Sequence, residues 1–155
     1  MRCHVASDGR LRARGAGVLS RQLVQAYLAT AYQVRLAADP VTLTIGPLAG
    51  SVRRWLARRS CRELVVVTAA NPVSRPLGRW PNQSRNQALQ AWLRRKGWQC
   101  LPAAGVPLRP GWEAEESLAI VGMSVDAGAA AGRRFGQNAI VHASILRGVR
   151  LILLR

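Results

Sequence analysis

The feature of this sequence that most constrains its fold is an unbroken apolar run, Leu64-Val65-Val66-Val67-Thr68-Ala69-Ala70, which ends at Asn71-Pro72. Such a run, rich in β-branched residues, predicts a strand that is buried on both faces of a sheet. The strand stops at Pro72 because proline donates no backbone hydrogen bond and pushes the preceding residue out of helical geometry. A sheet built around this strand needs cover on both faces, so we expect helices on both sides.

The pattern from Glu63 onward predicts the order strand, helix, strand, strand, helix, strand, which is the split βαβ of ferredoxin-like folds. The predicted elements are the strand Leu64–Ala69, the helix Asn82–Lys96, the strand Trp98–Leu101, the strand Ser117–Val121, a helix from Ser124 or Asp126 to Phe135, and the strand Asn138–Ile145. A loop rich in glycine and proline is expected from Gly105 to Trp112. We expect the two most apolar strands, Leu64–Ala69 and Ser117–Val121, to lie centrally and parallel in a mixed sheet.

Further elements extend this α+β core at both ends. Ser20 is placed to cap a helix that runs to Thr30, and the alternating segments Ala31–Leu36 and Val41–Ile45 predict a hairpin. A short helix is expected at Ser51–Ser60, and Val149–Leu154 completes a C-terminal hairpin. We therefore expect a flexible basic leader over residues 1–19 and one α+β domain over residues 20–155.

The charge is strongly positive: 23 basic residues stand against 7 acidic ones, for a net charge of +16. This field attracts nucleic acid, anionic metabolites or anionic membrane surfaces without specifying any of them. Apolar residues make up 49% of the chain, but no run approaches the roughly 18 residues of a membrane span. We expect a cytoplasmic protein that does not cross a membrane.

Metal and thiol chemistry are not indicated by the sequence. Cys3, Cys61 and Cys100 lie far apart and form no CxxC pair, and His4 and His142 are not at ligand spacing. We expect reduced thiols, no metal site and no cofactor. Motifs for a nucleophilic serine, a phosphate-binding loop or paired carboxylates are also missing.

The predicted topology sorts the polar residues into two clusters. The start of the last core strand should lie beside the end of the first, which brings together Asn71, Arg75, Arg85, Gln137 and Asn138. Parallel central strands would place a second cluster, Trp112, Glu115 and Ser117, at the opposite edge of the sheet. We interpret the first cluster as a ligand-binding site.

Each of these residues also has a structural interpretation. Asn71 before a proline is typical of a turn, and Gln137 and Asn138 can satisfy loop backbone after Gly136. Arg85 on the inward edge of its helix needs an anionic partner, either a buried carboxylate or a bound anion. Glu115 is expected to pair with an arginine. His142 in an apolar strand is typical of a satisfied core or edge histidine.

Four motifs give the chain a family resemblance. They are Thr68-Ala-Ala-Asn-Pro-Val-Ser-Arg-Pro-Leu77, Asn82-Gln-Ser-Arg85, Trp112 with Glu115 and Ser117, and Phe135-Gly-Gln-Asn-Ala-Ile-Val141. With them, the sequence from about Leu23 to Arg155 resembles a bacterial family catalogued as domain of unknown function 3293. Two positions depart from that family: Pro81 stands where relatives often have an acid, and His142 where they often have tryptophan. The resemblance implies no activity.

Three functional hypotheses follow from the sequence. The first is a binding domain for an anionic small molecule or nucleotide-like ligand at the edge formed by Asn71, Arg85 and Gln137. The second is a basic protein that binds nucleic acid or the ribosome through arginine contacts to phosphate. The third is an enzyme that uses the same edge, with Glu115 contributed by a partner chain; a closed pocket holding an acid of raised pKa would favour it. The sequence leaves the enzymatic status and the oligomeric state undetermined.

Overall fold

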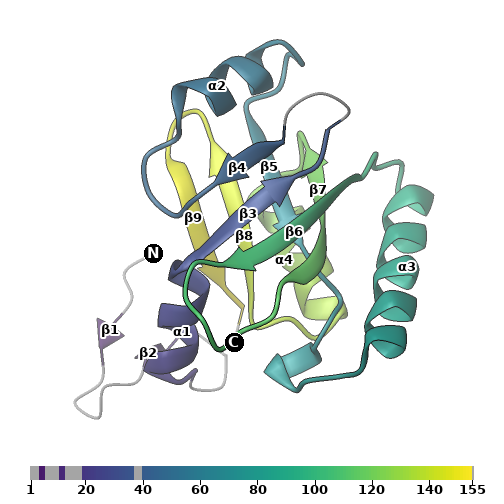
Figure 1. Cartoon of the computed structure of the whole chain (residues 1–155). Coiled ribbons are helices and arrows are strands. Elements are labelled where there is room, and N and C mark those ends of the chain that lie inside the picture. Colours follow the sequence, from purple (N-terminus) through teal and green to yellow (C-terminus); the bar gives the residue numbers. More distant parts are fainter. Residues whose placement is uncertain (1–3, 6–10, 13–18, 37–39, 155) are drawn as a thin grey trace.

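The computed structural model of this chain describes residues 4–5, 11–12, 19–36 and 40–154 (Figure 1). The strands are β1 (His4–Val5), β2 (Leu11–Arg12), β3 (Thr30–Val34), β4 (Val41–Leu43), β5 (Glu63–Val67), β6 (Leu101–Pro107), β7 (Glu115–Val121), β8 (Ala139–Ser144) and β9 (Gly148–Leu153). The helices are α1 (Arg21–Leu28), α2 (Gly50–Ala57), α3 (Arg79–Arg95) and α4 (Val125–Arg134), with a short 3-10 turn at Pro72–Ser74. Most of the predicted leader, residues 1–19, lies outside the described residues.

Seven strands form one sheet in the order β4-β3-β6-β7-β5-β8-β9, and every neighbouring pair is antiparallel. The sheet curls into a half-barrel (Figure 1). The central position predicted for β5 and β7 is confirmed, but the prediction of a mixed sheet with these strands parallel is wrong. The helix α3 returns the chain so that β6 runs in the direction of β5. The β6–β7 connection then reverses the chain, and β7 enters between β6 and β5 antiparallel to both.

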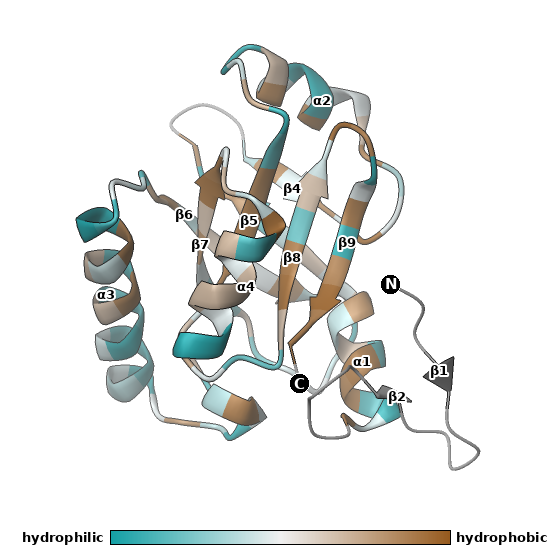
Figure 2. Cartoon of the chain, turned by 180° about the vertical axis from the view of Figure 1, so that it is seen from behind, coloured by the Kyte–Doolittle hydropathy of each residue, from teal (hydrophilic) through white to brown (hydrophobic). Residues whose placement is uncertain are grey.

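The convex face of the half-barrel packs against α3 and α4. From α3, Leu89 and Leu93 are fully buried against this face. The helix α4 lies close to the strands because two of its positions are glycine: a Cβ on Gly128 would stand 2.8 Å from a methyl group of Val65, and a Cβ on Gly132 would stand 2.5 Å from one of Leu154. Figure 2 shows α4 lying across the sheet on this side.

The concave face is covered unevenly. At one end α2 inserts Val52, Trp55 and Leu56, which pack on Leu64 and Val149 of the sheet. The helix α1 lies at the other end (Figure 1). Alternation along β5 divides its residues between the two cores, with Leu64 and Val66 in the concave core and Val65 and Val67 in the convex core.

The helix ends follow their local sequence. The hydroxyl of Ser20 accepts a hydrogen bond from the Leu23 backbone N–H at 3.2 Å, and that of Ser124 accepts one from Ala127 at 3.3 Å. Gly97 and Gly136 stop α3 and α4 with positive φ angles of 84° and 77°. Within the described part of the chain, no helix is both long and apolar enough to span a bilayer.

Candidate functional site

A cavity of about 840 Å³ opens in the concave face, at the end of the half-barrel away from α2. Its walls come from α1, from the end of β5 and the loop after it, and from the β6–β7 loop; lining residues include Tyr27, Tyr32, Asn71, Trp112, Glu115 and Ser117. The volume falls in the range of sites for small organic molecules. The site is therefore internal to the sheet rather than at its outer edge.

One row of residues across three strands creates this space. Tyr32 of β3 is paired with Gly105 of β6, and Gly105 is paired with Glu115 of β7. Gly105 carries no side chain, so room remains between the tyrosine ring and the carboxyl group. A Cβ at position 105 would meet Thr30 Cγ2 at 3.4 Å and Tyr32 Cε1 at 3.6 Å, which are ordinary contacts. A small side chain at position 105 would therefore fit in contact with Thr30 and the Tyr32 ring, and a larger one would extend into the cavity.

The side chain of Glu115 lines the cavity and has a neutral partner. Its Oε2 accepts a hydrogen bond of 2.7 Å from Asn71 Nδ2. Among the described residues the one ion pair within 4.0 Å joins His142 to Glu63, so Glu115 meets no described cation. Burial raises the pKa of the Glu115 carboxyl above its ordinary range, and the hydrogen bond from Asn71 opposes that shift. The arginine partner expected for Glu115 is not found among the described residues.

The turn that carries Asn71 is held by amide side chains. Asn71 Oδ1 accepts hydrogen bonds from the Leu77 backbone N–H at 2.8 Å and from Asn82 Nδ2 at 2.9 Å. Asn82 Oδ1 in turn accepts one from the Asn71 backbone N–H at 2.9 Å. These contacts fix Asn71 in the left-handed conformation, with φ of 42°, and aim its Nδ2 at Glu115.

The next residues of this turn are strained. Val73 and Ser74 have φ angles of 52° and 56°. A β-branched residue in this region is a clear outlier, and strain of this kind collects at functional sites. The conformation directs the Ser74 hydroxyl toward the cavity side of the loop, where it lies 2.8 Å from Tyr27 Oη.

Two tyrosines complete the polar lining, and Asn138 supports it through Ser74. Asn138 Nδ2 donates to Ser74 Oγ at 2.8 Å, and Tyr32 Oη donates to the Tyr27 carbonyl oxygen at 3.0 Å. Burial, followed by the nearby Tyr27, raises the pKa of the Tyr32 phenol, which keeps it a neutral donor. The hydroxyl groups therefore tie α1 to β3 and to the strained turn.

Arg85 lies between the end of β5 and the end of α4, as expected, but its partners are backbone carbonyls rather than a carboxylate. Its Nε donates to the Ala69 carbonyl at 2.6 Å and its Nη2 to the Phe135 carbonyl at 2.7 Å. Phe135 is the residue that caps the C-terminus of α4, where a cation is favourable. Gln137 Nε2 donates to the neighbouring Ala70 carbonyl at 2.8 Å. Arg85 is not among the residues that line the cavity; it bridges the end of β5 to the end of α4.

The structure merges the two predicted clusters. Glu115 and Ser117 line the same cavity as Asn71 and Gln137, and Trp112 stands half exposed at its mouth. Their separation to opposite edges is wrong, because the antiparallel pairing of Val67 with Leu118 puts the end of β5 beside the start of β7. Asn138 reaches the site through Ser74. Arg75 is exposed and does not line the cavity.

Four contributors were missed at the level of sequence: Tyr27, Tyr32, Ser74 and Gly105. Both tyrosines lie in segments whose apolar pattern was interpreted as packing alone. The tyrosine hydroxyl groups could have indicated a polar site, because a buried tyrosine hydroxyl usually finds a polar partner. Gly105 was assigned to a loop, so its place in a strand row facing a cavity could not be anticipated.

Exposed apolar side chains concentrate in the segments that border the cavity, and two of them, Leu77 and Trp112, line it. Of the seven large hydrophobic side chains exposed among the described residues, six lie in α1, in the loop after β5 with the start of α3, or in the β6–β7 loop: Leu28, Val73, Leu77, Trp80, Leu108 and Trp112. The seventh, Leu146, is in the β8–β9 turn. Gathered apolar exposure of this kind marks binding surfaces.

His142 and the groups that it contacts lie away from the cavity. His142 Nε2 is 2.7 Å from Glu63 Oε2, and Arg150 Nη2 is 3.3 Å from His142 Nδ1. This satisfied chain matches the structural interpretation of His142. Within the described ranges, no three His, Cys, Asp or Glu side chains come together as a metal site would need.

Comparison with known proteins finds a similarity to one family over part of the chain and indicates no activity. The model for a family described as "Protein of unknown function (DUF3293)" matches residues 67–140. The resemblance inferred from the sequence motifs is confirmed over that segment, which runs from the last residue of β5 into β8. No curated protein and no solved structure matches the chain.

Proposed function

We propose that the segment shared with the DUF3293 family builds most of a small-molecule binding site, in which Glu115 is the polar anchor. The observation that carries the proposal is a half-buried carboxyl group that faces a cavity of about 840 Å³ and has an amide as its hydrogen-bond partner. Among the described residues this carboxyl group has no cation as a partner, and a half-buried carboxylate of that kind is costly unless its free oxygen serves a ligand.

The lining indicates the chemistry of the ligand. A carboxylate accepts hydrogen bonds, so the group that meets Glu115 is an N–H donor or a cation. The tyrosine rings and Trp112 offer apolar walls for an aromatic or aliphatic body. The anionic ligand expected from the sequence relied on Arg85, whose Nε and Nη2 already donate to backbone carbonyls. An anionic group of a nucleotide-like ligand would have to lie near Arg79, which lines the same cavity.

The test is a thermal-shift and calorimetric screen of small fragments grouped by chemistry: aromatic amines and amidines, neutral aromatics, and aromatic carboxylates or phosphates. Members of the first group should stabilise the protein by about 1.4 kcal/mol at ten times their dissociation constant. For a chain of this size that is a rise in melting temperature of roughly 3–6 °C.

Two variants and a control make the screen specific. Glu115→Gln should lose the preference for amines. Gly105→Val should weaken the binding of all three groups of fragments, because its side chain fills space beside Tyr32. Asp126→Asn removes one negative charge from an exposed position in the first turn of α4 and should bind as the parent does. Equal binding by Glu115→Gln and the parent would refute the anchoring role of Glu115.

We also propose that Glu115 exchanges a proton with its ligand, as a general acid–base group of an enzyme. The raised pKa of the carboxyl in a cavity supports this second function. Affinity for a permanently cationic fragment should rise with pH as Glu115 ionises, whereas affinity for a neutral fragment that accepts a hydrogen bond should fall. If the affinities of both fragments stay constant between pH 4 and 8, Glu115 does not change its protonation state on binding and the acid–base proposal is refuted.

A further inference from the structure

The end of the half-barrel opposite the cavity carries a dense cluster of arginines. Residues 53–62 contain five of them, and residues 40–62 contain no acid. We name as the basic cap the exposed side chains of α2, the segment after it and the β8–β9 turn: Arg53, Arg54, Arg58, Arg59, Arg62 and Arg147. Hydrogen bonds join these segments, since Ile145 N–H donates to the Arg62 carbonyl at 2.9 Å.

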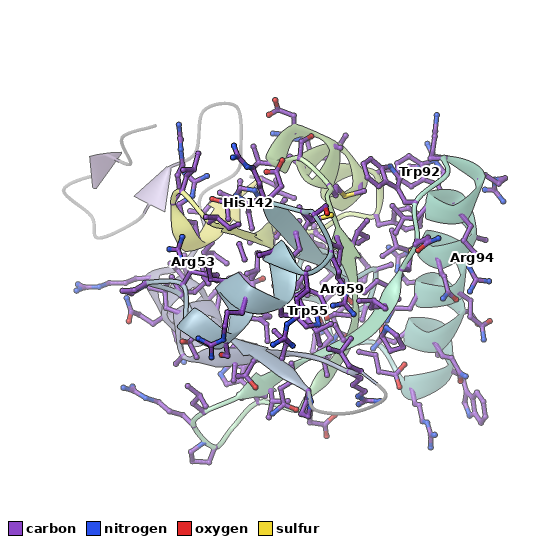
Figure 3. All side chains as sticks on the ribbon, turned by 90° about the horizontal axis from the view of Figure 1, so that it is seen from above. Arg53, Trp55, Arg59, Trp92, Arg94 and His142 are labelled. Carbon is purple, nitrogen blue, oxygen red and sulfur yellow. The ribbon has the colours of Figure 1, made fainter. Side chains whose placement is uncertain are left out.

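The guanidinium groups of the basic cap are available. Among the described residues none of the six forms an ion pair within 4.0 Å or donates a side-chain hydrogen bond. Arg85 and Arg150, by contrast, each donate to described acceptors. Arg59 is held over the ring of Trp55 at 4.2 Å, which orders one planar group at the surface. Figure 3, viewed from this side, shows Arg53 and Arg59 on and beside α2, with Arg94 far from them on α3.

The large apolar side chains of α2 are buried in the protein core and are not available to a partner. Val52, Trp55 and Leu56 are buried in the concave core, so the outer surface of the helix is arginine with small residues. A membrane-surface helix needs an apolar face to bury in the lipid. The partner that fits is therefore one recognised by charge and planar hydrogen bonding alone.

We propose that the basic cap binds the phosphate backbone of nucleic acid, independently of the cavity. Arginine matches phosphate because its planar group donates two parallel hydrogen bonds. A helix of eight residues is about 12 Å long. A duplex carries a charge about every 1.7 Å of its axis, so α2 faces on the order of seven phosphates. The contact carries little sequence preference, because phosphate contacts position a protein without reading bases.

Binding through about five of these arginines has a defined salt dependence. The logarithm of the association constant should fall with the logarithm of salt concentration at a slope of about −4.5 for duplex DNA. Between 50 and 200 mM salt the affinity should fall on the order of 500-fold. Fluorescence anisotropy with a mixed-sequence 20-base-pair duplex and a matched single strand measures both values on the full chain.

Two triple variants separate the cap from charge in general. The cap variant is Arg53→Gln/Arg54→Gln/Arg58→Gln, and the control is Arg21→Gln/Arg109→Gln/Arg133→Gln, three exposed arginines from α1, the β6–β7 loop and the end of α4. Both lower the net charge equally. The cap variant should bind at least tenfold more weakly at 50 mM salt with a slope shallower by 2 to 3, and the control should lose less than threefold. The triple Arg→Lys cap variant should keep the slope.

Three results would overturn the proposal: no binding by the parent at 50 mM salt, equal losses in the cap and control triples, or binding to anionic phosphatidylserine vesicles with none to nucleic acid. Circular dichroism and thermal melting confirm that each variant is folded. Because the cavity lies at the other end, the cap variant should retain fragment binding, so failure here leaves the cavity proposal untouched.

Discussion

The two ends of the half-barrel share one concave face, but one end is filled by side chains and the other contains a cavity. At the α2 end, Leu56 and Val52 are almost fully buried and fill the space above Leu64. At the α1 end, Gly105 leaves a gap between Tyr32 and Glu115, and the space remains a cavity. If the cavity binds a ligand as proposed, packing and binding fall to separate halves of the same sheet. A residue's contribution should then depend on which half it occupies.

Charge divides in the same way. Three acids, Glu113, Glu115 and Glu116, line the cavity, whereas the α2 end presents the six arginines of the basic cap. A ligand that carries a cationic or donor group is thus drawn to one end and a polyanion to the other.

Removing a packed side chain at the α2 end should have the largest effect. Leu56→Ala should lower the free energy of unfolding by about 2–5 kcal/mol, because it empties a fully buried position. Leu77→Ala, at the cavity mouth where the side chain is partly exposed, should cost about 0.5 kcal/mol. Urea denaturation measures both, and similar losses at the two positions would remove the distinction between the ends.

Arg85 should behave as a structural residue. Arg85→Met removes two hydrogen bonds from a charged donor to backbone carbonyls, each worth about 1.5–3 kcal/mol. Because Arg85 is half-buried and water can replace part of these contacts, we expect a stability loss below their sum, roughly 2–3 kcal/mol. Arg85→Lys should restore it poorly because lysine lacks the planar fork. If instead stability is unchanged while phosphate binding disappears, Arg85 is an anion-binding residue as the sequence suggested.

Glu115→Gln should affect binding more than folding. Amine affinity should fall at least tenfold, about 1.4 kcal/mol, while the melting temperature at pH 7 should hold or rise. Burial raises the pKa of the Glu115 carboxyl in the folded state, so the folded protein binds this proton more tightly than the unfolded chain does. The parent protein therefore loses stability as the pH rises from the unfolded pKa through the folded pKa of Glu115. Melting curves from pH 4 to 8 should converge for the two proteins at the acid end. A lower melting temperature at pH 7 for the variant would mean that Glu115 stabilises the fold.

The smallest effect is expected at the strained turn. Val73→Gly relieves a positive φ angle of 52°, which costs about 1–2 kcal/mol in a side-chain-bearing residue, but adds chain entropy to the unfolded state. A net gain of up to about 1 kcal/mol should appear in urea denaturation, together with weaker fragment binding as the Ser74 contact loosens. A clear destabilisation would show that the turn is not strained.

Local sequence signals predicted the elements well but not the way in which they pair. The caps at Ser20 and Ser124 and the central place of Leu64–Val67 follow from short-range chemistry. The direction of β7 does not, because it depends on β7 entering between β5 and β6. That single error separated Glu115 from Asn71, which the structure joins by a hydrogen bond.

Gly105 and Pro107 show how pairing overrides local propensity. Both residues are typical of loops, yet β6 continues through Pro107 because its neighbours β3 and β7 supply partners along its length. The cavity depends on this outcome, since Gly105 faces it from the middle of a strand row. The ferredoxin-like relationship of the core stays a prediction.

The most direct test of the account is the pKa of Glu115, measured by carbon-detected NMR of the side-chain carboxyl with Glu115→Gln to assign the signal. We predict a value above the ordinary glutamate value of about 4.3 in the free protein, which falls when an amine fragment binds. A pKa at or below 4.3 that no fragment changes would contradict the claim that the Glu115 carboxyl group binds a ligand in the cavity of the half-barrel.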